Sequence, residues 1–120
     1  MTDISPPNFK SLLSDFNRLY ILVILCQGPA YGYQIITQFQ RNLQKNISPG
    51  MVYPFLERLE KNGYITHTKT IIEERQRKTY QLTPKGQDFC HTLFKLFTAI
   101  FAPAFETISS QQLSGVSEGS

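Results

Sequence analysis

The feature of the sequence that most constrains the fold is a change of hydrophobic periodicity at Asn62-Gly63. Before it, apolar side chains recur at the 3/4 spacing of an amphipathic helix: Val52, Phe55, Leu56 and Leu59. After it, residues 64–70 are β-prone, with threonine at alternate positions, and residues 77–82 form a second short β-prone stretch. Asn62-Gly63 itself suits the left-handed conformation that ends a helix. The sequence therefore predicts a helix followed by a β-hairpin whose mobile tip is the charged segment 71–76.

Two more helices are expected before this one. The first covers residues 8–27, is apolar nearly all round over residues 19–26, and ends at Gly28-Pro29. The second covers residues 31–44 and contains Gly32, which costs a helix about 1 kcal/mol relative to alanine. A close approach by another helix would explain this glycine. The apolar run in the first helix predicts that it is packed on several sides.

Two helix starts combine a capping residue with proline. Ser48 is a good N-cap and Pro49 a good first residue of the third helix, because the missing N–H would be unsatisfied there anyway. Thr83-Pro84 repeats this signal and predicts a last helix, bent at Pro103. The expected fold class is mainly α, a winged helix-turn-helix of three helices and a β-hairpin wing, with a long C-terminal helix. Its expected parts are a flexible N-terminal arm (1–8), a winged helix domain (9–83), a dimerisation helix (84–112) and a disordered tail (113–120).

Positive charge is concentrated in the middle of the chain. The net charge of the whole chain is only +3, but residues 41–85 hold nine basic and four acidic residues, a net charge of +5. A concentrated positive field suits a polyanionic partner. In a winged helix-turn-helix the third helix enters the major groove with its N-terminal residues, and the wing lies along the backbone or minor groove. Double-stranded DNA is therefore the expected partner.

Enzyme chemistry is not expected from this sequence. It contains no phosphate-cradling glycine loop, no metal-ligand spacing and no nucleophile–base constellation, so we predict no catalytic residue, metal or cofactor. Cys26 and Cys90 lie in apolar surroundings and are interpreted as small buried thiols in a reducing compartment. Residues 1–10 lack a signal-peptide layout, and the apolar run 19–26 is shorter than the ~20 residues of a membrane span. A cytoplasmic location is expected.

Three sequence blocks, in this order and spacing, resemble the PadR family of transcriptional regulators. They are Tyr31–Ile35, Ser48–Ile65 and Arg77–Gly86, and the resemblance covers roughly residues 18–86. It implies a winged-helix homodimer, usually a repressor, whose C-terminal helix packs across the two-fold axis. The single C-terminal helix is similar to the short subfamily.

The resemblance and the helix geometry together give the expected DNA-binding residues. They lie on the second helix, at the start and end of the third helix, and on the wing: Tyr33, Ser48, Pro49, Gly50, Met51, Tyr53, Lys61, Arg75, Arg77 and Lys78. Two positions depart from the family pattern. Met51 stands where a small hydroxyl residue, usually threonine, is common, and residues 73–76 lack the Gly-Arg-Pro character often seen in the wing.

The C-terminal helix is the expected dimer interface. Five of the nine phenylalanines fall between residues 89 and 105, so this helix is apolar on two sides and must be covered. The expected interface residues are Phe89, Leu93, Phe94, Phe97, Ile100, Phe101 and Phe105. A dimer would read a pseudo-palindromic operator. The family also binds ligands near its dimer interface, and an aromatic-rich interface suits a small planar aromatic effector.

Two alternatives stay open at this point. The C-terminal helix can be an ordinary intramolecular core helix, in which case its aromatic stripe holds no effector. The winged helix can also serve as a protein–protein interaction module without DNA binding, since the fold alone permits it. The acidic residues of the central segment, which weaken its positive field, favour that alternative: Glu57, Glu60, Glu73 and Glu74.

Overall fold

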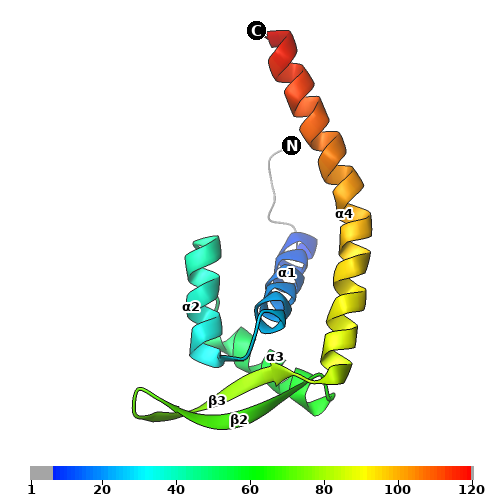
Figure 1. The fold of residues 1–120 in the computed structure, drawn as a ribbon. Helices are drawn as coiled ribbons and strands as arrows, with labels where there is room; N and C mark the ends of the chain where they lie inside the picture. The colour runs from blue at the N-terminus through cyan, green and yellow to red at the C-terminus, as the bar shows by residue number, and fades with distance from the viewer. Residues whose placement is uncertain (1–6, 120) are drawn as a thin grey trace. The chain divides into compact units, whose positions relative to one another are not determined.

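A computed structural model describes the backbone of residues 7–119 and the side chains of residues 11–112. The elements follow the order α1 (Pro7–Cys26), β1 (Ala30–Tyr31), α2 (Gly32–Leu43), α3 (Pro49–Lys61), β2 (Ile65–Ile72), β3 (Arg75–Leu82) and α4 (Pro84–Gly119) (Figure 1). The chain divides after Asp88 into two units. The first unit holds three helices and the sheet, which confirms the predicted mainly α, winged helix-turn-helix class.

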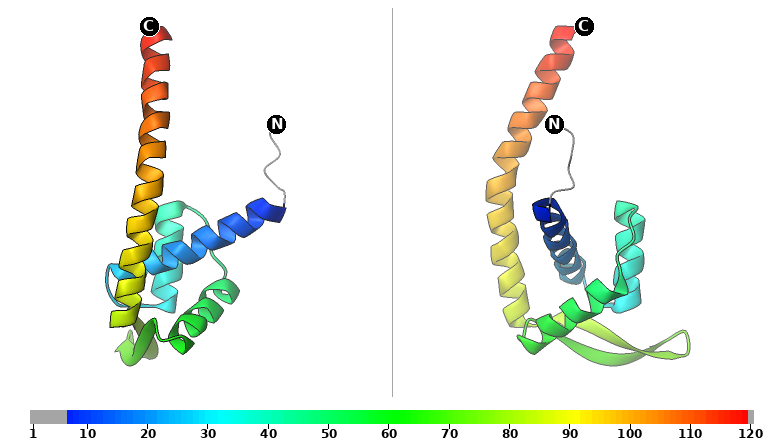
Figure 2. Two further views of the ribbon diagram at one scale, coloured as in Figure 1. Left: turned by 90° about the vertical axis from the view of Figure 1, so that its right-hand side faces the viewer. Right: turned by 180° about the vertical axis from the view of Figure 1, so that it is seen from behind.

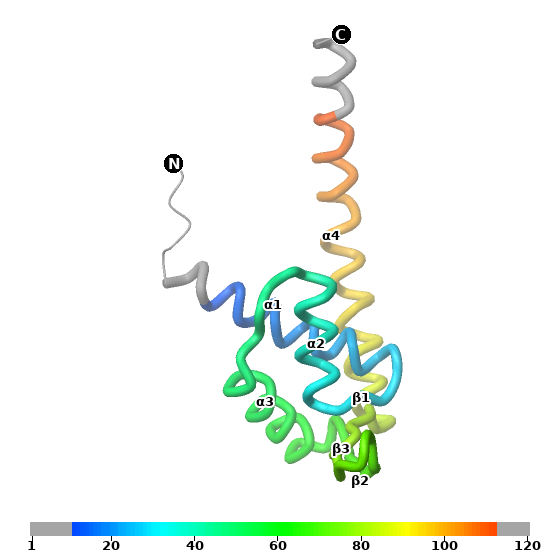
Figure 3. Tube along the Cα trace, turned by 90° about the vertical axis from the view of Figure 1, so that its left-hand side faces the viewer, coloured from blue at the N-terminus to red at the C-terminus, as the bar shows by residue number. Residues whose placement is uncertain are grey.

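The core of the first unit lies between its three helices and the sheet. Each of α1, α2 and α3 contacts the other two, and Figure 3 shows α1 crossing α2. The most buried side chains come from all three helices and from β2: Ile21, Ile35, Phe39, Val52, Leu56 and Ile65. The central position predicted for residues 19–26 is confirmed as far as Leu25. Cys26 was expected to be buried but is exposed, because it is the last residue of α1.

The start of α3 follows the predicted capping chemistry. The Ser48 side chain accepts a hydrogen bond from the backbone N–H of Met51 at 3.2 Å, and Pro49 is the first helical residue. The predicted close approach at Gly32 is also confirmed. A Cβ built on Gly32 would lie 2.6 Å from the hydroxyl oxygen of Tyr53, so α2 and α3 meet where only hydrogen fits. The glycine therefore leaves room for the Tyr53 ring.

The sheet has three strands in the order β1-β3-β2, one more than predicted. Ala30 pairs with Tyr80 and Tyr31 pairs with Thr79. β1 has only two residues, too few to show an alternating pattern. Because β1 fixes the start of α2 to the middle of β3, it anchors the wing to the helical part of the first unit.

The loop of the hairpin is shorter than the predicted tip 71–76. Strand pairing continues to Ile72 and Arg75, which leaves Glu73 and Glu74 as the whole turn. Both have positive φ, at 52° and 65°. Two-residue turns of this kind match the right-handed twist of paired strands, which explains how the turn closes without glycine. The turn projects past α2 (Figures 1 and 2).

The first turn of α4 is tied to the end of α3. Thr83 caps α4 by accepting a hydrogen bond from the backbone N–H of Gly86 at 3.1 Å, as predicted. The Thr83 hydroxyl donates to the carbonyl oxygen of Gly63 at 2.6 Å, and the Lys85 ammonium donates to the carbonyl oxygen of Asn62 at 2.8 Å. These bonds fix the point where α3 ends.

The predicted outer boundaries differ from the observed ones. α1 begins at Pro7, inside the predicted arm 1–8, whose other residues up to residue 6 lie outside the described part of the chain. The backbone of α4 continues to Gly119, past the predicted end at Gln112, and the side chains of the expected tail 113–120 lie outside the described residues. Over residues 7–119, none of the helices combines the length and apolar character needed to cross a membrane.

Candidate nucleic-acid interface

The first turn of α3 presents its backbone to solvent. Ser48, Pro49 and Gly50 are exposed, and Met51 is half-buried. A Cβ on Gly50 would meet only the Ser48 hydroxyl, at 3.5 Å, so no neighbouring element covers this glycine. Pro49 has no N–H, and the N–H of Met51 is bonded to Ser48. This turn therefore attracts an anion through the N–H of Gly50 and the helix dipole. This end of α3 can therefore approach a phosphate or a base edge closely.

A cleft beside α3 brings together residues from β1, α2, α3 and β3. It has a volume of about 250 Å³ and is lined by Tyr31, Gly32, Tyr33, Tyr53, Glu57, Gln76, Arg77, Lys78 and Tyr80. Four of the predicted DNA-binding residues line it: Tyr33, Tyr53, Arg77 and Lys78. We call it the tyrosine cleft.

Arg77 is held inside the tyrosine cleft by aromatic rings. Its guanidinium carbon lies 5.3 Å from the centre of the Tyr31 ring and 5.7 Å from that of Tyr33, within the range of cation–π attraction. The structure keeps Arg77 near the turn, on β3 opposite Thr70, but places its guanidinium against the rings of Tyr31 and Tyr33 instead of leaving it at a mobile tip. Tyr31 was missed as a site residue, because its role depends on the pairing of β1 with β3, which no local pattern predicts.

The other predicted site residues lie away from this cleft. Lys61 is the last residue of α3, about 18 Å along the helix axis from Pro49 at 1.5 Å per residue. Arg75 is exposed beside the turn of the wing, where it pairs with Ile72. The residues therefore form three groups: the start of α3, the tyrosine cleft, and two outlying cations.

A second depression continues the tyrosine cleft along α2. It has a volume of about 280 Å³, shares Tyr31 and Tyr33 with the cleft, and ends at Arg41. Its remaining lining is neutral and polar: Gln34, Thr37 and Gln38. The two depressions make a strip with cations at both ends, which suits a sugar–phosphate backbone.

Carboxylates border the interface on α3. Glu57 lines the tyrosine cleft, and Glu60 lies one turn further along, with Oε2 2.5 Å from Nδ1 of His67 on β2. Sequence reasoning placed His67 on a strand without assigning it a partner. Burial raises the pKa of the Tyr80 hydroxyl, and the charges of Glu60, Tyr53 and Glu57 raise it further. Tyr80 therefore lines the cleft as an uncharged side chain.

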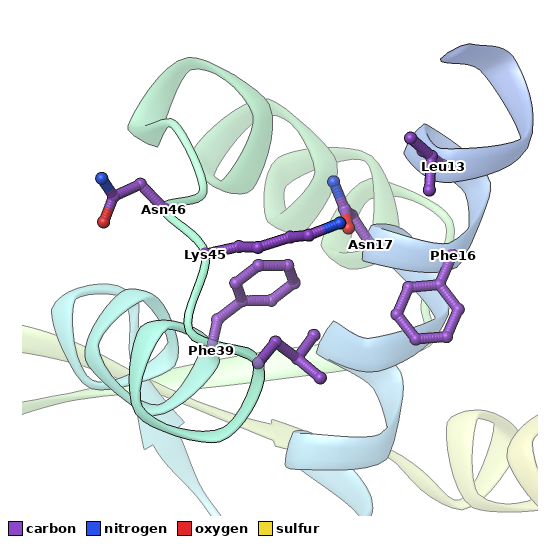
Figure 4. Close-up of a pocket in the computed structure, with 7 residues that line it drawn as sticks. Leu13, Phe16, Asn17, Phe39, Lys45 and Asn46 are labelled. Carbon is purple, nitrogen blue, oxygen red and sulfur yellow. The ribbon is translucent and has the colours of Figure 1, made fainter. Parts of the chain in front are cut away.

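A separate pocket of about 380 Å³ lies between α1 and the end of α2 (Figure 4). Its lining is mostly apolar, with Phe39 as the most buried member, and Figure 4 shows the Lys45 side chain extended toward Asn17. This pocket shares no residue with the tyrosine cleft. Among the described side chains no group of three His, Cys, Asp or Glu residues is placed to hold a metal ion.

The second unit exposes most of its large apolar side chains. Four of the predicted dimer residues are exposed, namely Phe89, Ile100, Phe101 and Phe105, the last with 71% of its surface accessible. Leu93, Phe94 and Phe97 are half-buried. The rings of Phe97 and Phe101 stack with their centres 5.1 Å apart. Leu96 and Ile108 are exposed as well and were not among the predicted interface residues.

Three helices, a three-stranded sheet with a projecting hairpin, and cations beside the third helix define a winged helix-turn-helix protein. The model of the PadR-like family of transcriptional regulators matches residues 21–92. The chain belongs to this family. The family, and the relatives from Mycobacterium tuberculosis and Bacillus cereus described next, are transcriptional regulators rather than enzymes, as predicted.

Individual relatives agree with this assignment. A transcriptional regulator of Mycobacterium tuberculosis is 31% identical over 70 residues, which is 58% of this chain and 64% of the relative. The chain therefore spans less than two thirds of that curated relative. The structure of a PadR-like regulator from Bacillus cereus superposes with a TM-score of 0.69 at 26% identity, covering 82% of this chain and 95% of the other. Bacillus subtilis PadR, solved in complex with operator DNA, gives a TM-score of 0.58 at 30% identity, covering 64% of this chain and 46% of the other.

Proposed function

We propose that this chain is a sequence-specific DNA-binding repressor that acts as a homodimer on a pseudo-palindromic operator. The observation that carries the proposal is the tyrosine cleft, which gathers Arg77 and Lys78 beside Tyr53 of α3, the helix whose first turn is exposed. Phosphate contacts fix a protein on the duplex, while base edges are read from the groove. The operator complex of Bacillus subtilis PadR supports the same use of the fold.

The exposed apolar row on α4 supports the homodimer. Phe101 and Phe105 expose 55% and 71% of their surfaces, which is unfavourable for an isolated chain in water. A second copy of the same row covers these rings in an isologous two-fold contact. The small planar aromatic effector is proposed for this interface. The cytoplasmic location stays a prediction.

A gel-shift titration against the chain's own upstream DNA tests the proposal. Binding that prefers this DNA over an unrelated duplex, and weakens steeply as salt rises, is the expected result. Sedimentation should give a dimer, and the substitution Phe105→Glu should give a monomer. Equal weak binding to every duplex, even at low salt, would overturn sequence-specific recognition.

A protein-interaction module is the second candidate, and Glu57 favours it because a carboxylate in the tyrosine cleft opposes an anion. Charge reversal at Arg77 and Lys78 separates the two functions. A DNA-binding protein loses the duplex and keeps its dimer, whereas an interaction module loses a protein partner instead.

A further inference from the structure

We infer that the tyrosine cleft is a preformed site for one phosphate group of the DNA backbone, in which Tyr31 and Tyr33 position Arg77 and the phosphate takes the N–H donors of its guanidinium. This inference rests on the proposed DNA-binding function and assigns one contact within it. Tyr31 and Tyr33 are positioning residues, whereas Arg77 is the group that touches the ligand.

The first argument is the way in which Arg77 is held. Cation–π contacts with Tyr31 and Tyr33 fix the plane of the guanidinium but use none of its five N–H donors. Among the described side chains no hydrogen bond or ion pair involves this guanidinium, and its Nε is buried without an acceptor. A phosphate in the cleft therefore meets the terminal N–H groups of the half-buried Arg77, since its Nε is covered by protein atoms.

The second argument is the charge of the cleft. Arg77 and Lys78 are the cations in its lining, and Glu57 is the acid. No carboxylate oxygen lies within ion-pair distance of the Arg77 guanidinium among the described side chains, so its charge is not neutralised there. Two oxygens of one phosphate group have the spacing of two N–H donors on a planar guanidinium. The guanidinium therefore binds the phosphate through two parallel hydrogen bonds.

The third argument is the shape of the cleft. The Tyr53 ring lies where a side chain on residue 32 would have to be, and its hydroxyl is 2.6 Å from the Cβ position of such a side chain. Gly32 is the first residue of α2, so the start of that helix borders the same cleft. A helix N-terminus favours negative charge and adds to the attraction of Arg77 for a phosphate.

The first test compares substitutions in the cleft by gel shift over a salt series. Arg77→Gln should weaken binding about tenfold or more on the operator and by the same factor on unrelated DNA, because a phosphate contact carries no sequence information. The slope of log affinity against log salt should become shallower by about one unit, the change expected for the loss of one phosphate contact. Tyr33→Leu should weaken binding while the slope stays unchanged, because the charge remains and only its positioning is lost. Lys95→Gln, on α4, is the charge-matched control and should change neither quantity.

The second test locates the phosphate. Ethylating the phosphates of the operator one at a time should reveal one position per half-site that blocks binding of the unaltered chain but adds no penalty to Arg77→Gln. An unchanged ethylation pattern in that variant would overturn the assignment of Arg77. Failure of the unaltered chain to bind any duplex would instead overturn the proposed function. Titration with inorganic phosphate, followed by the Nε resonance of Arg77, asks whether a free phosphate fills the site. Suppose that inorganic phosphate saturates the change in the Arg77 Nε resonance, but Arg77→Gln leaves the salt slope of DNA binding unchanged. The site would then bind free phosphate, and the DNA backbone would be overturned as the source of the ligand.

Both tests need folded variants. Arg77→Lys keeps the charge but loses the planar fork, so it should keep the salt slope and recover only part of the affinity. Equal thermal unfolding midpoints for the three Arg77 forms would show that the loss of binding is not a loss of fold. Full recovery of affinity by Arg77→Lys would overturn the proposed fork geometry.

Discussion

Oε2 of Glu60 on α3 lies 2.5 Å from Nδ1 of His67 on β2. This bond joins α3 to the wing, and both side chains are about one quarter to one third exposed, at 30% and 26%. We expect a coupling of about 0.5–1 kcal/mol between the two residues, as for a partly exposed charged hydrogen bond. A double-mutant cycle with Glu60→Gln and His67→Gln, followed by urea unfolding, measures this energy. Additive effects of the two substitutions would contradict a direct link.

Gly32→Ala tests the contact between α2 and α3. Gly32 is the first residue of α2, so helix propensity favours alanine there by less than the ~1 kcal/mol of a helix interior. The new Cβ occupies the place of the Tyr53 ring and forces that ring to turn out of the cleft. We expect the substitution to lower both stability and DNA affinity. Gly50→Ala is the matched control for stability, since its Cβ meets only the Ser48 hydroxyl at 3.5 Å.

The same contact can be tested by removing the ring. In a Tyr53→Ala background the Gly32→Ala substitution should become stabilising, because the obstacle is gone and the helix propensity remains. The change of sign is measured by thermal unfolding of the four variants. A Gly32→Ala effect that is the same in both backgrounds would show that Tyr53 does not cause it.

The turn of the wing offers a stabilising substitution. Glu73 and Glu74 both have positive φ, a conformation that costs residues with a Cβ about 1–2 kcal/mol and that asparagine and glycine adopt readily. Replacing the pair by Asn-Gly should raise the free energy of unfolding by about 1 kcal/mol or more. Replacing it by Gln-Gln removes the like charges but keeps the strain, so it should recover much less. Equal gains from the two pairs would assign the effect to charge.

Tyr80 gives the stability of the chain a dependence on alkaline pH. Burial and nearby Glu60 raise the pKa of Tyr80 in the folded chain above its ordinary value of 10.0. A raised pKa means that the folded state keeps its proton longer than the unfolded state, so stability is fully present below pH 10 and falls as pH rises toward the folded pKa. Tyr80→Phe should therefore show a flatter loss of stability above pH 10. Below pH 9 the difference between the two proteins should stay constant.

The sequence predicts those parts of the fold that depend on residues close together in the chain. Ser48-Pro49 and Thr83-Pro84 mark helix starts through local capping chemistry, and the helical spacing of apolar residues identifies what is buried. The position of Arg77 could not be predicted in this way. It depends on a two-residue strand that pairs Tyr31 with Thr79, and such a strand has no periodicity of its own.

The composition of the tyrosine cleft leads to the last prediction. Glu57 is the acid among its lining residues, and it faces the region where we place a phosphate. Because Glu57 is exposed, solvent screens its repulsion, and we expect Glu57→Gln to raise DNA affinity only about twofold to fivefold. Glu73→Gln, at the turn of the wing and outside the cleft, is the charge-matched control. The gain should fade as salt rises, since it is electrostatic in origin. A drop in affinity for Glu57→Gln would mean that this carboxylate supports DNA binding, for example by accepting a hydrogen bond from a base, and would place the phosphate elsewhere.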